Sequence, residues 1–450
     1  MKFISKTFVL SVAAFVPLLT VFYALDVMNG IPLGDEWRWI KNLLLPYVDG
    51  KIGFWNYLTG EYSFLGHTHF LTLMALLVNY QFFSLDLVYL AYFGLVFYVL
   101  GWLLLLMYLF RYQSDKSWYT MLSIALITVA YFSITTDFPW LLVSFEYFYY
   151  FFALAILVLA DGFLCKRISF TWLCVATFFS ALFLDSFGVV AVLAIILVLS
   201  LNNLVERRKI FQPILLLAIF FSTWILLKIA IGDGINTSSS SRFNTLALLL
   251  GKPGDIFESL LISFSQPLLD KAVLQYFFPF FYRTAQMIVG AAGLVLVAIS
   301  LVGYGRNFND SKSRLPFLLA GYASVAWVLI LLTRYSDFGA GIFDAQRFTR
   351  FFVLYYVAAA FAFLKWRAMP KVFALFAILL LGSYAISANY QYSNVASVHQ
   401  YFEGAGNALR EVNLQDGNLN KYIGKCSDRY CDETIYSLRE KGIPFVQANH

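Results

Sequence analysis

The sequence predicts an all-α fold, a polytopic transmembrane helical bundle with about 11 spans. Hydrophobic residues make up 60% of the 450 residues, and the mean hydropathy is +0.72, whereas soluble domains average about 45–50% apolar residues. The apolar residues also form long unbroken runs such as 85–110. Runs of this length satisfy their backbone polar groups as helices, whereas a barrel would show short alternating strands.

The predicted spans begin at the N-terminus. The opening MKFISK is followed by an apolar run long enough to cross a bilayer, and no A-x-A-like cleavage site follows it. We therefore expect an uncleaved first helix rather than a signal peptide. The predicted spans are residues 7–27, 86–110, 117–136, 146–164, 170–184, 187–204, 210–231, 281–303, 315–333, 351–366 and 372–388.

Basic residues set the predicted orientation. With the N-terminus in the cytoplasm and the C-terminus in the periplasm, every inside segment is basic, as the positive-inside rule requires. The net charge of +6 is explained by these segments and indicates no nucleic-acid partner. The basic residues are Lys2, Lys6, Arg111, Lys116, Lys166, Arg167, Arg207, Arg208, Lys209, Arg306, Lys312, Arg314, Lys365, Arg367 and Lys371.

This orientation requires that the apolar stretch 67–83 does not cross the membrane. If it crossed, every later loop would invert and the basic clusters would face outward. Asn79 and Gln81 interrupt the stretch. We therefore expect a helix that lies at the outer interface or re-enters shallowly.

Two domains follow from this arrangement. Residues 1–388 form the membrane domain, with a first periplasmic loop at 28–85 and a long one at 232–280. Residues 389–450 have ordinary soluble composition and form a small periplasmic domain. We expect a strand and a helix there, around NKYIGKC and ETIYSLREKG.

Two cysteines of the tail suit a disulfide. Cys426 and Cys431 lie in a segment that the orientation places in an oxidising compartment. Two free thiols or half of a metal site are the alternatives. No second Cys/His pair with zinc-site spacing lies nearby, so the disulfide is favoured.

The first periplasmic loop carries an adjacent acidic pair, Asp35 and Glu36. A low-dielectric surround and a like-charged neighbour raise a carboxyl pKa, which suits a general base, and the pair also suits a metal ion or another cation. The alternative is structural: Asp35 is a good N-cap for a helix that begins at Trp37. Trp37 itself is a candidate to stack on a sugar ring.

Two histidines follow in the same loop. His67 and His69 could join Asp35 or Glu36 around a metal, or bind a sugar hydroxyl or a phosphate. Interfacial histidines often do neither. Because the i, i+2 spacing is poor for a helix and no third ligand is fixed, we predict no metal site.

A late periplasmic turn, residues 333–352, carries three arginines: Arg334, Arg347 and Arg350. Arginine binds phosphate through its planar fork, and at a membrane interface it can hold a phospholipid-like head group while its stem stays apolar. Anchoring by snorkelling is the alternative, and it is favoured for Arg334. Arg347 lies near Asp344 in an aromatic turn and is the stronger phosphate candidate.

Two further acidic residues flank predicted spans. Asp137 and Glu146 are ionisable groups in an apolar setting, which makes them candidate substrate contacts. They could equally pair with the periplasmic arginines for structural reasons. Aromatic residues make up 19% of the chain and suit sugar stacking, although interfacial belts and helix packing account for most of them.

Four motifs together resemble a known family. They are the acidic GDEW loop after the first helix, the His-led helix GHTHFLTLMALLVNYQFF, the FDAQRFTRFF turn and the tail ending YSLREKGIPFV. With these motifs the chain resembles bacterial polytopic membrane glycosyltransferases of fold class C. Among them it is similar to the serotype-converting glucosyltransferases that modify the O-antigen of lipopolysaccharide.

The resemblance implies a site and a reaction in the bacterial inner membrane. The donor would be a sugar, expected to be glucose, on undecaprenyl or another polyprenyl phosphate. The acceptor would be a hydroxyl of O-antigen, lipopolysaccharide or another surface glycan. Asp35 matches the proposed general base, Glu36 its neighbour and Arg347 the donor-phosphate ligand. Attack opposite the phosphate would invert the anomeric centre, and no cofactor is required, although a divalent cation is compatible.

Two other functions compete with this one. An O-antigen polymerase or ligase has similar length and a long external loop, but the acidic first loop and the folded tail argue against it. A lipid-linked saccharide transporter or flippase would show internal repeats or paired Gly/Pro-interrupted helices. No convincing repeat is visible in the sequence.

Overall fold

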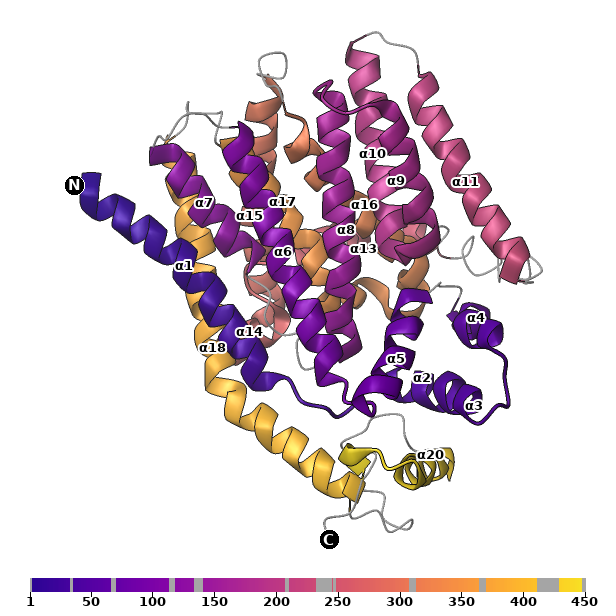
Figure 1. Ribbon diagram of the computed structural model, residues 1–450. Helices are drawn as coiled ribbons and strands as arrows, with labels where there is room; N and C mark the ends of the chain where they lie inside the picture. Colours follow the sequence, from indigo (N-terminus) through magenta and orange to yellow (C-terminus); the bar gives the residue numbers. More distant parts are fainter. Residues whose placement is uncertain are drawn as a thin grey trace. The chain divides into compact units, whose positions relative to one another are not determined.

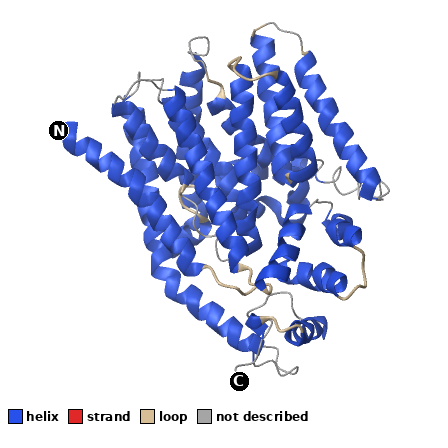
Figure 2. Ribbon diagram, viewed as in Figure 1, coloured by secondary structure: helices blue, strands red, loops and turns tan. Residues whose placement is uncertain are grey.

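The computed structural model describes residues 2–32, 35–65, 70–112, 118–132, 141–206, 210–231, 245, 248–306, 313–363, 370–410 and 429–446. Within these ranges every regular element is a helix and none is a strand, which confirms the predicted all-α class (Figure 2). The expected strand around NKYIGKC lies outside the described residues.

The helices are labelled along the chain in Figure 1. The first group is α1 (Lys2–Val27), α2 (Asp35–Trp39), η1 (Ile40–Leu44), α3 (Leu45–Val48), α4 (Phe54–Leu65), α5 (Phe70–Phe83), α6 (Val88–Tyr112), α7 (Trp118–Tyr131), α8 (Leu141–Leu164), α9 (Phe170–Phe183), α10 (Asp185–Val205) and α11 (Phe211–Ile231). The second is α13 (Pro253–Ser265), α14 (Lys271–Phe277), α15 (Tyr282–Arg306), α16 (Leu315–Phe338), η2 (Gly339–Asp344), η3 (Gln346–Phe348), α17 (Thr349–Phe363), α18 (Pro370–Arg410), α20 (Arg429–Glu440) and η4 (Pro444–Val446).

The apolar helices indicate a membrane protein. Six described segments are long and apolar enough to cross a bilayer: Val88–Arg111, Ser144–Leu164, Ser186–Val205, Tyr282–Arg306, Leu315–Asp344 and Val372–Asn407. Shorter apolar helices are Ser11–Val27, Phe70–Phe83, Thr120–Tyr131, Phe170–Phe183 and Phe211–Leu227. The count of about 11 spans stays a prediction, as does the interfacial position of α5.

The predicted span 351–366 corresponds to the most enclosed helix of the chain. α17 has 15 residues, and every one of them is buried. It packs against α16, α15, α7 and α13. Its uniform apolar character therefore comes from contact with other helices, because a helix that is hydrophobic on all sides suits a core as well as a bilayer.

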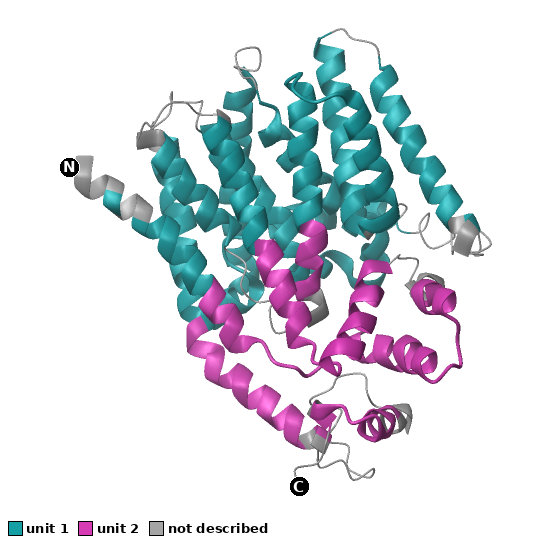
Figure 3. Ribbon diagram, in the orientation of Figure 1, with its two compact units in different colours: residues 1–20, 99–136, 151–391 teal, residues 21–98, 137–150, 392–450 magenta. Residues whose placement is uncertain are grey.

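The chain divides into two compact units (Figure 3). Unit 1 contains residues 1–20, 99–136 and 151–391, and unit 2 contains residues 21–98, 137–150 and 392–450. The first loop and the C-terminal tail therefore belong to the same unit.

In unit 1, two glycines let α15 approach α13 and α17 closely. A Cβ atom at Gly290 would meet the backbone carbonyl of Leu261 on α13, and one at Gly293 would meet the Tyr356 hydroxyl on α17. Small residues at a helix interface permit close backbone approach inside membranes. The α13–α15 contact holds this part of the long loop against the apolar bundle.

In unit 2, the tail docks on the first loop. The Lys441 ammonium lies 2.6 Å from Asp49, which follows α3. Arg439 on α20 donates to the carbonyls of Leu409 and Val446 at 2.6 and 2.8 Å. The helix predicted around ETIYSLREKG is therefore confirmed as α20.

Two local predictions need correction. The first-loop helix begins at Asp35 rather than at Trp37, and it continues into the π-helical turn η1. The long loop 232–280 contains α13 and α14. Pro253 and Asp255 in the first turn of α13 are helix-start signals, but they do not belong to a long apolar run.

Candidate functional site

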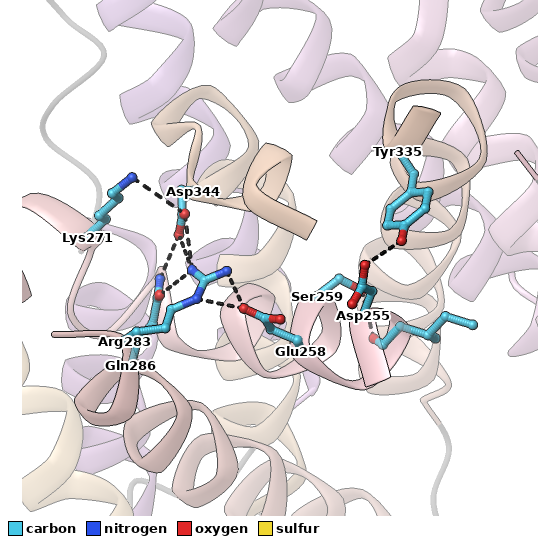
Figure 4. A network of polar contacts seen from close by, with 9 residues as sticks. Asp255, Glu258, Ser259, Lys271, Arg283, Gln286, Tyr335 and Asp344 are labelled. Atoms are coloured by element: carbon cyan, nitrogen blue, oxygen red, sulfur yellow. Dashed lines mark hydrogen bonds and ion pairs between the residues drawn. The ribbon is translucent and has the colours of Figure 1, made fainter. Parts of the chain in front are cut away.

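A polar network lies where α13, α14, α15 and η2 meet in unit 1 (Figure 4). Its centre is Arg283, in the first turn of α15. The Arg283 Nε atom donates to Glu258 Oε1 on α13 at 2.7 Å, and Nη1 donates to Asp344 Oδ2 of η2 at 3.1 Å. One guanidinium thus joins three helical elements, which its planar fork of donors permits.

Gln286 completes this network from the next turn of α15. Its Oε1 atom accepts from Arg283 at 2.8 Å, and its Nε2 atom donates to Asp344 Oδ1 at 2.8 Å. Gln286 is fully buried. Both oxygens of Asp344 are therefore hydrogen-bonded. These contacts fix the end of η2, just before residues 346–350, which carry Arg347 and Arg350 and are called the arginine turn below.

A glycine makes the turn into η2. α16 ends at Phe338, and the next residue, Gly339, has φ +61° and ψ −160°. That backbone region is essentially restricted to glycine. The chain reverses there and brings Asp344 back toward α13 and α15.

A second acidic side chain, Asp270, also contacts the arginine turn. Asp270 caps α14 by accepting from the Val273 backbone amide at 2.8 Å, and it accepts from Gln346 Nε2 at 3.1 Å. Burial raises the pKa of Asp270, against the lowering effect of these hydrogen bonds. Asp270 therefore positions Gln346 of η3, the residue immediately before Arg347.

The three predicted arginines occupy different environments in unit 1. Arg347 lies in η3, half-buried, with its guanidinium carbon 5.0 Å from the Phe348 ring centroid. Arg350, in the first turn of α17, is only 2% exposed and lies 5.2 Å from the Phe187 ring. Arg334 is half-buried near the end of α16. The turn thus brings Arg347 and Arg350 within one helical turn of each other, in an aromatic setting.

One further polar contact joins α13 and α16. The Tyr335 hydroxyl donates to the Asp255 carboxylate, and Asp255 lies one turn before Glu258 (Figure 4). Tyr335 follows Arg334 directly, so this contact fixes the backbone that carries Arg334.

The acidic pair of the first loop lies at the start of α2 in unit 2. Asp35 is the first helical residue, and its side chain lies outside the described atoms. Glu36 is 1% exposed. Its neighbour Trp37 is also buried and donates from its indole nitrogen to the Pro32 carbonyl at 2.7 Å. Trp37 therefore ties α2 to the preceding chain, which accounts for its burial without a sugar ring.

The helix changes type just after this pair. η1, at Ile40–Leu44, follows α2 without a break and has π-helical hydrogen bonding. Such turns are rare and occur frequently at functional sites. The acidic pair itself lies in the α-helical segment α2, one turn before η1.

Several predicted site residues lie outside the described part of the chain or away from the polar network. His67, His69, Asp137 and Cys426 lie outside the described residues, and so does the side chain of Cys431. The disulfide therefore stays a prediction. Glu146 is half-buried on α8 in unit 2. Among the described residues, no group of three or more His, Cys, Asp or Glu side chains is placed to hold a metal ion.

Comparisons with known proteins were made for the whole chain. No protein-family model, curated protein or solved structure matches it. The function proposed below therefore rests on the residues and their geometry.

The sequence indicated the arginine turn but not its supports. Asp344 lies near Arg347 in the sequence, whereas Arg283 and Glu258 are not among the predicted site residues. Arg283 lies 61 residues from Asp344 along the chain, so no spacing rule connects them. The available signal was charge: a lone arginine at the start of an apolar span is costly unless it has a partner.

Proposed function

We propose that this protein is an inverting membrane glycosyltransferase that moves a sugar, expected to be glucose, from a polyprenyl-phosphate donor to a surface-glycan hydroxyl. The proposed location is the bacterial inner membrane, with the reaction at its periplasmic face. The observation that carries the proposal is the arginine turn. Arg347 and Arg350 stand within one helical turn beside apolar spans, on a backbone that Asp344 and Asp270 hold in place.

This turn suits the donor's leaving group. A phosphate on a long hydrocarbon chain reaches the protein from the bilayer, and two guanidinium groups can bind its oxygens bidentately. Aromatic rings around Arg350 lower the local dielectric, which strengthens that attraction. The network around Arg283 keeps the turn pre-organised, so little ordering is required when the phosphate arrives.

The reaction balances without a cofactor. The acceptor hydroxyl loses its proton to the Asp35 carboxylate while its oxygen attacks the anomeric carbon. The bond between that carbon and the phosphate oxygen breaks, and the electron pair leaves with the phosphate. The arginines stabilise the charge that develops on the departing oxygen.

The proposal is tested by transfer assays with the full-length protein in membranes. The donor is polyprenyl-phosphate glucose with a labelled sugar, and the acceptor is lipopolysaccharide. We expect Asp35→Asn to lower kcat by about 100-fold or more, and Arg347→Gln to raise the donor KM by about tenfold, the equivalent of one charge-assisted hydrogen bond. Lys252→Gln, at an exposed lysine before α13, is the matched control.

Three results would argue against the proposal. Full transfer by Asp35→Asn would exclude it as the base. Equal donor KM values for Arg347→Gln and Lys252→Gln would exclude the arginine turn as the phosphate site. Joining of whole repeat units, with no single-sugar product, would instead assign the polymerase or ligase function.

A further inference from the structure

The connection between α14 and α15 carries an unusual surface. Tyr276, Phe277, Phe278, Phe280 and Phe281 are all exposed, and Phe280 is 90% exposed. The turn is nevertheless ordered, because the Phe278 amide donates to the Leu274 carbonyl at 2.8 Å and the Phe281 amide to the Phe278 carbonyl at 3.0 Å. This aromatic turn, residues 276–281, therefore presents its rings outward on a fixed backbone.

The aromatic turn continues into an apolar stripe along α15. Phe281, Ile288, Val295 and Val302 follow at seven-residue intervals, and each is more than half exposed. Residues seven apart lie on one face of a helix. The opposite face of α15, with Gly290 and its neighbours, packs on α13. The stripe is therefore the lipid-facing side of α15.

The length of the stripe indicates where the aromatic turn lies relative to the bilayer. The 21 residue steps from Phe281 to Val302 extend about 32 Å at the helical rise per residue, close to the roughly 30 Å thickness of the hydrocarbon layer. Phe281 therefore lies at one boundary of that layer. The aromatic turn and Lys271, which precedes it on α14, lie at the level of the lipid head groups.

Lys271 places a positive charge beside this turn. Its ammonium lies 5.9 Å from the Tyr282 ring centroid and 3.8 Å from Asp344 Oδ2, and its side chain is 40% exposed. Asp344 is already held by Arg283 and Gln286 at shorter distances. The Lys271 ammonium therefore has donors available for another anion.

We propose that Lys271 and the aromatic turn form a binding site for an anionic phospholipid of the bilayer. The phosphate of the head group contacts Lys271, and the acyl chains lie over Phe280, Phe281 and the α15 stripe. A lysine acts on phosphate as a point charge, and basic residues at the membrane surface attract anionic lipids. This site does not depend on the glycosyltransferase proposal, since it occupies the lipid-facing side of α15.

The first test measures lipid-dependent thermal stability of the full-length protein in neutral detergent. Dioleoylphosphatidylglycerol and dioleoylphosphatidylcholine are added at equal concentration. We expect the anionic lipid to raise Tm more than the zwitterionic one, because a ligand of the folded state stabilises it. Lys271→Gln should lose most of that difference, Lys271→Arg should keep it, and Lys252→Gln should match wild type.

The proposal would be overturned by equal Tm shifts from both lipids in wild type, by an unchanged difference in Lys271→Gln, or by an equal Tm shift with inorganic phosphate alone. The last result would assign a free-phosphate site. A shift with polyprenyl phosphate but not with phosphatidylglycerol would assign the site to the donor and would also overturn it.

A second test locates the aromatic turn directly. Phe280→Cys and Lys252→Cys are each placed in nanodiscs that contain phosphatidylglycerol, and labelling by a charged maleimide is measured above the wild-type background. We expect Phe280→Cys to label much more slowly in nanodiscs than in denaturant, and Lys252→Cys to label at similar rates in both. Equal protection of the two positions, or none at Phe280→Cys, would contradict insertion of the turn.

Discussion

At the residue scale, charged groups in this apolar chain are informative because each one needs a partner. On that principle, Arg347, which lies near Asp344 in the sequence, is predicted to bind phosphate, and this stays a prediction. The principle could not identify Arg283 as the partner of Asp344, because helix packing rather than local spacing joins them. Asp35 and Glu36 are predicted site residues on the same ground. Glu36 is buried.

Arg283 should be the most sensitive member of its network. Arg283→Met leaves Glu258 and Asp344 without their shared cation, and we expect the free energy of unfolding to fall by about 1–2 kcal/mol, toward the lower end because the pair with Glu258 is about one-third exposed. Thermal unfolding in detergent measures the loss. Arg306→Met, at the exposed far end of α15, is the control and should be neutral. Equal stability of the two variants would show that the network is not stabilising.

The Asp49–Lys441 pair should make docking of the tail pH-dependent. Lys441 holds the pKa of Asp49 below its ordinary value. The contribution of the Asp49–Lys441 pair to stability is therefore fully present above the pKa of an unfolded Asp, about 3.9. It is lost as pH falls through the lower pKa of Asp49 in the folded protein. We expect amide exchange in α20, corrected for its intrinsic pH dependence, to be unchanged from pH 7 to about 5 and to accelerate below about 4.

Two substitutions check that assignment at neutral pH. Asp49→Asn should accelerate exchange in α20, because the neutral amide leaves Lys441 without its anion. Lys51→Gln should not, since Lys51 is 71% exposed and leaves the Asp49–Lys441 contact intact. Similar exchange in both variants and wild type would show that the Asp49–Lys441 pair does not contribute to docking of the tail.

At the scale of elements, periodicity and composition predicted the long helices well. They did not predict α13 and α14, because both are short and their polar residues read as loop. They also did not separate α17, which is enclosed by other helices, from a lipid-facing span, since both are uniformly apolar. Which helices touch was not accessible from one sequence.

The contact of α15 with α13 supplies a sharp test of packing. In Gly290→Ala the added methyl group meets the Leu261 backbone carbonyl, which cannot rotate away. We expect destabilisation by about 2 kcal/mol or more. Gly382→Ala on α18 has open space around it and should be neutral or stabilising by up to about 1 kcal/mol. Thermal unfolding of both variants in the same detergent makes the comparison, and a stable Gly290→Ala protein would disprove the close contact.

At the scale of the whole molecule, the sequence predicted an all-α membrane protein with a folded tail, and the described helices agree. The division into two units could not be predicted, because each unit is assembled from segments far apart in the chain. The glycosyltransferase function stays a proposal.

The most direct measurement of that proposal is the mass of the host's surface polysaccharide. Cells that carry the intact gene are compared with cells that carry Asp35→Asn, with equal amounts of protein in the membrane. We predict that the intact gene adds one hexose to each repeat unit and that Asp35→Asn adds none. Identical repeat-unit masses in both cells, or a change in chain length alone, would contradict the account.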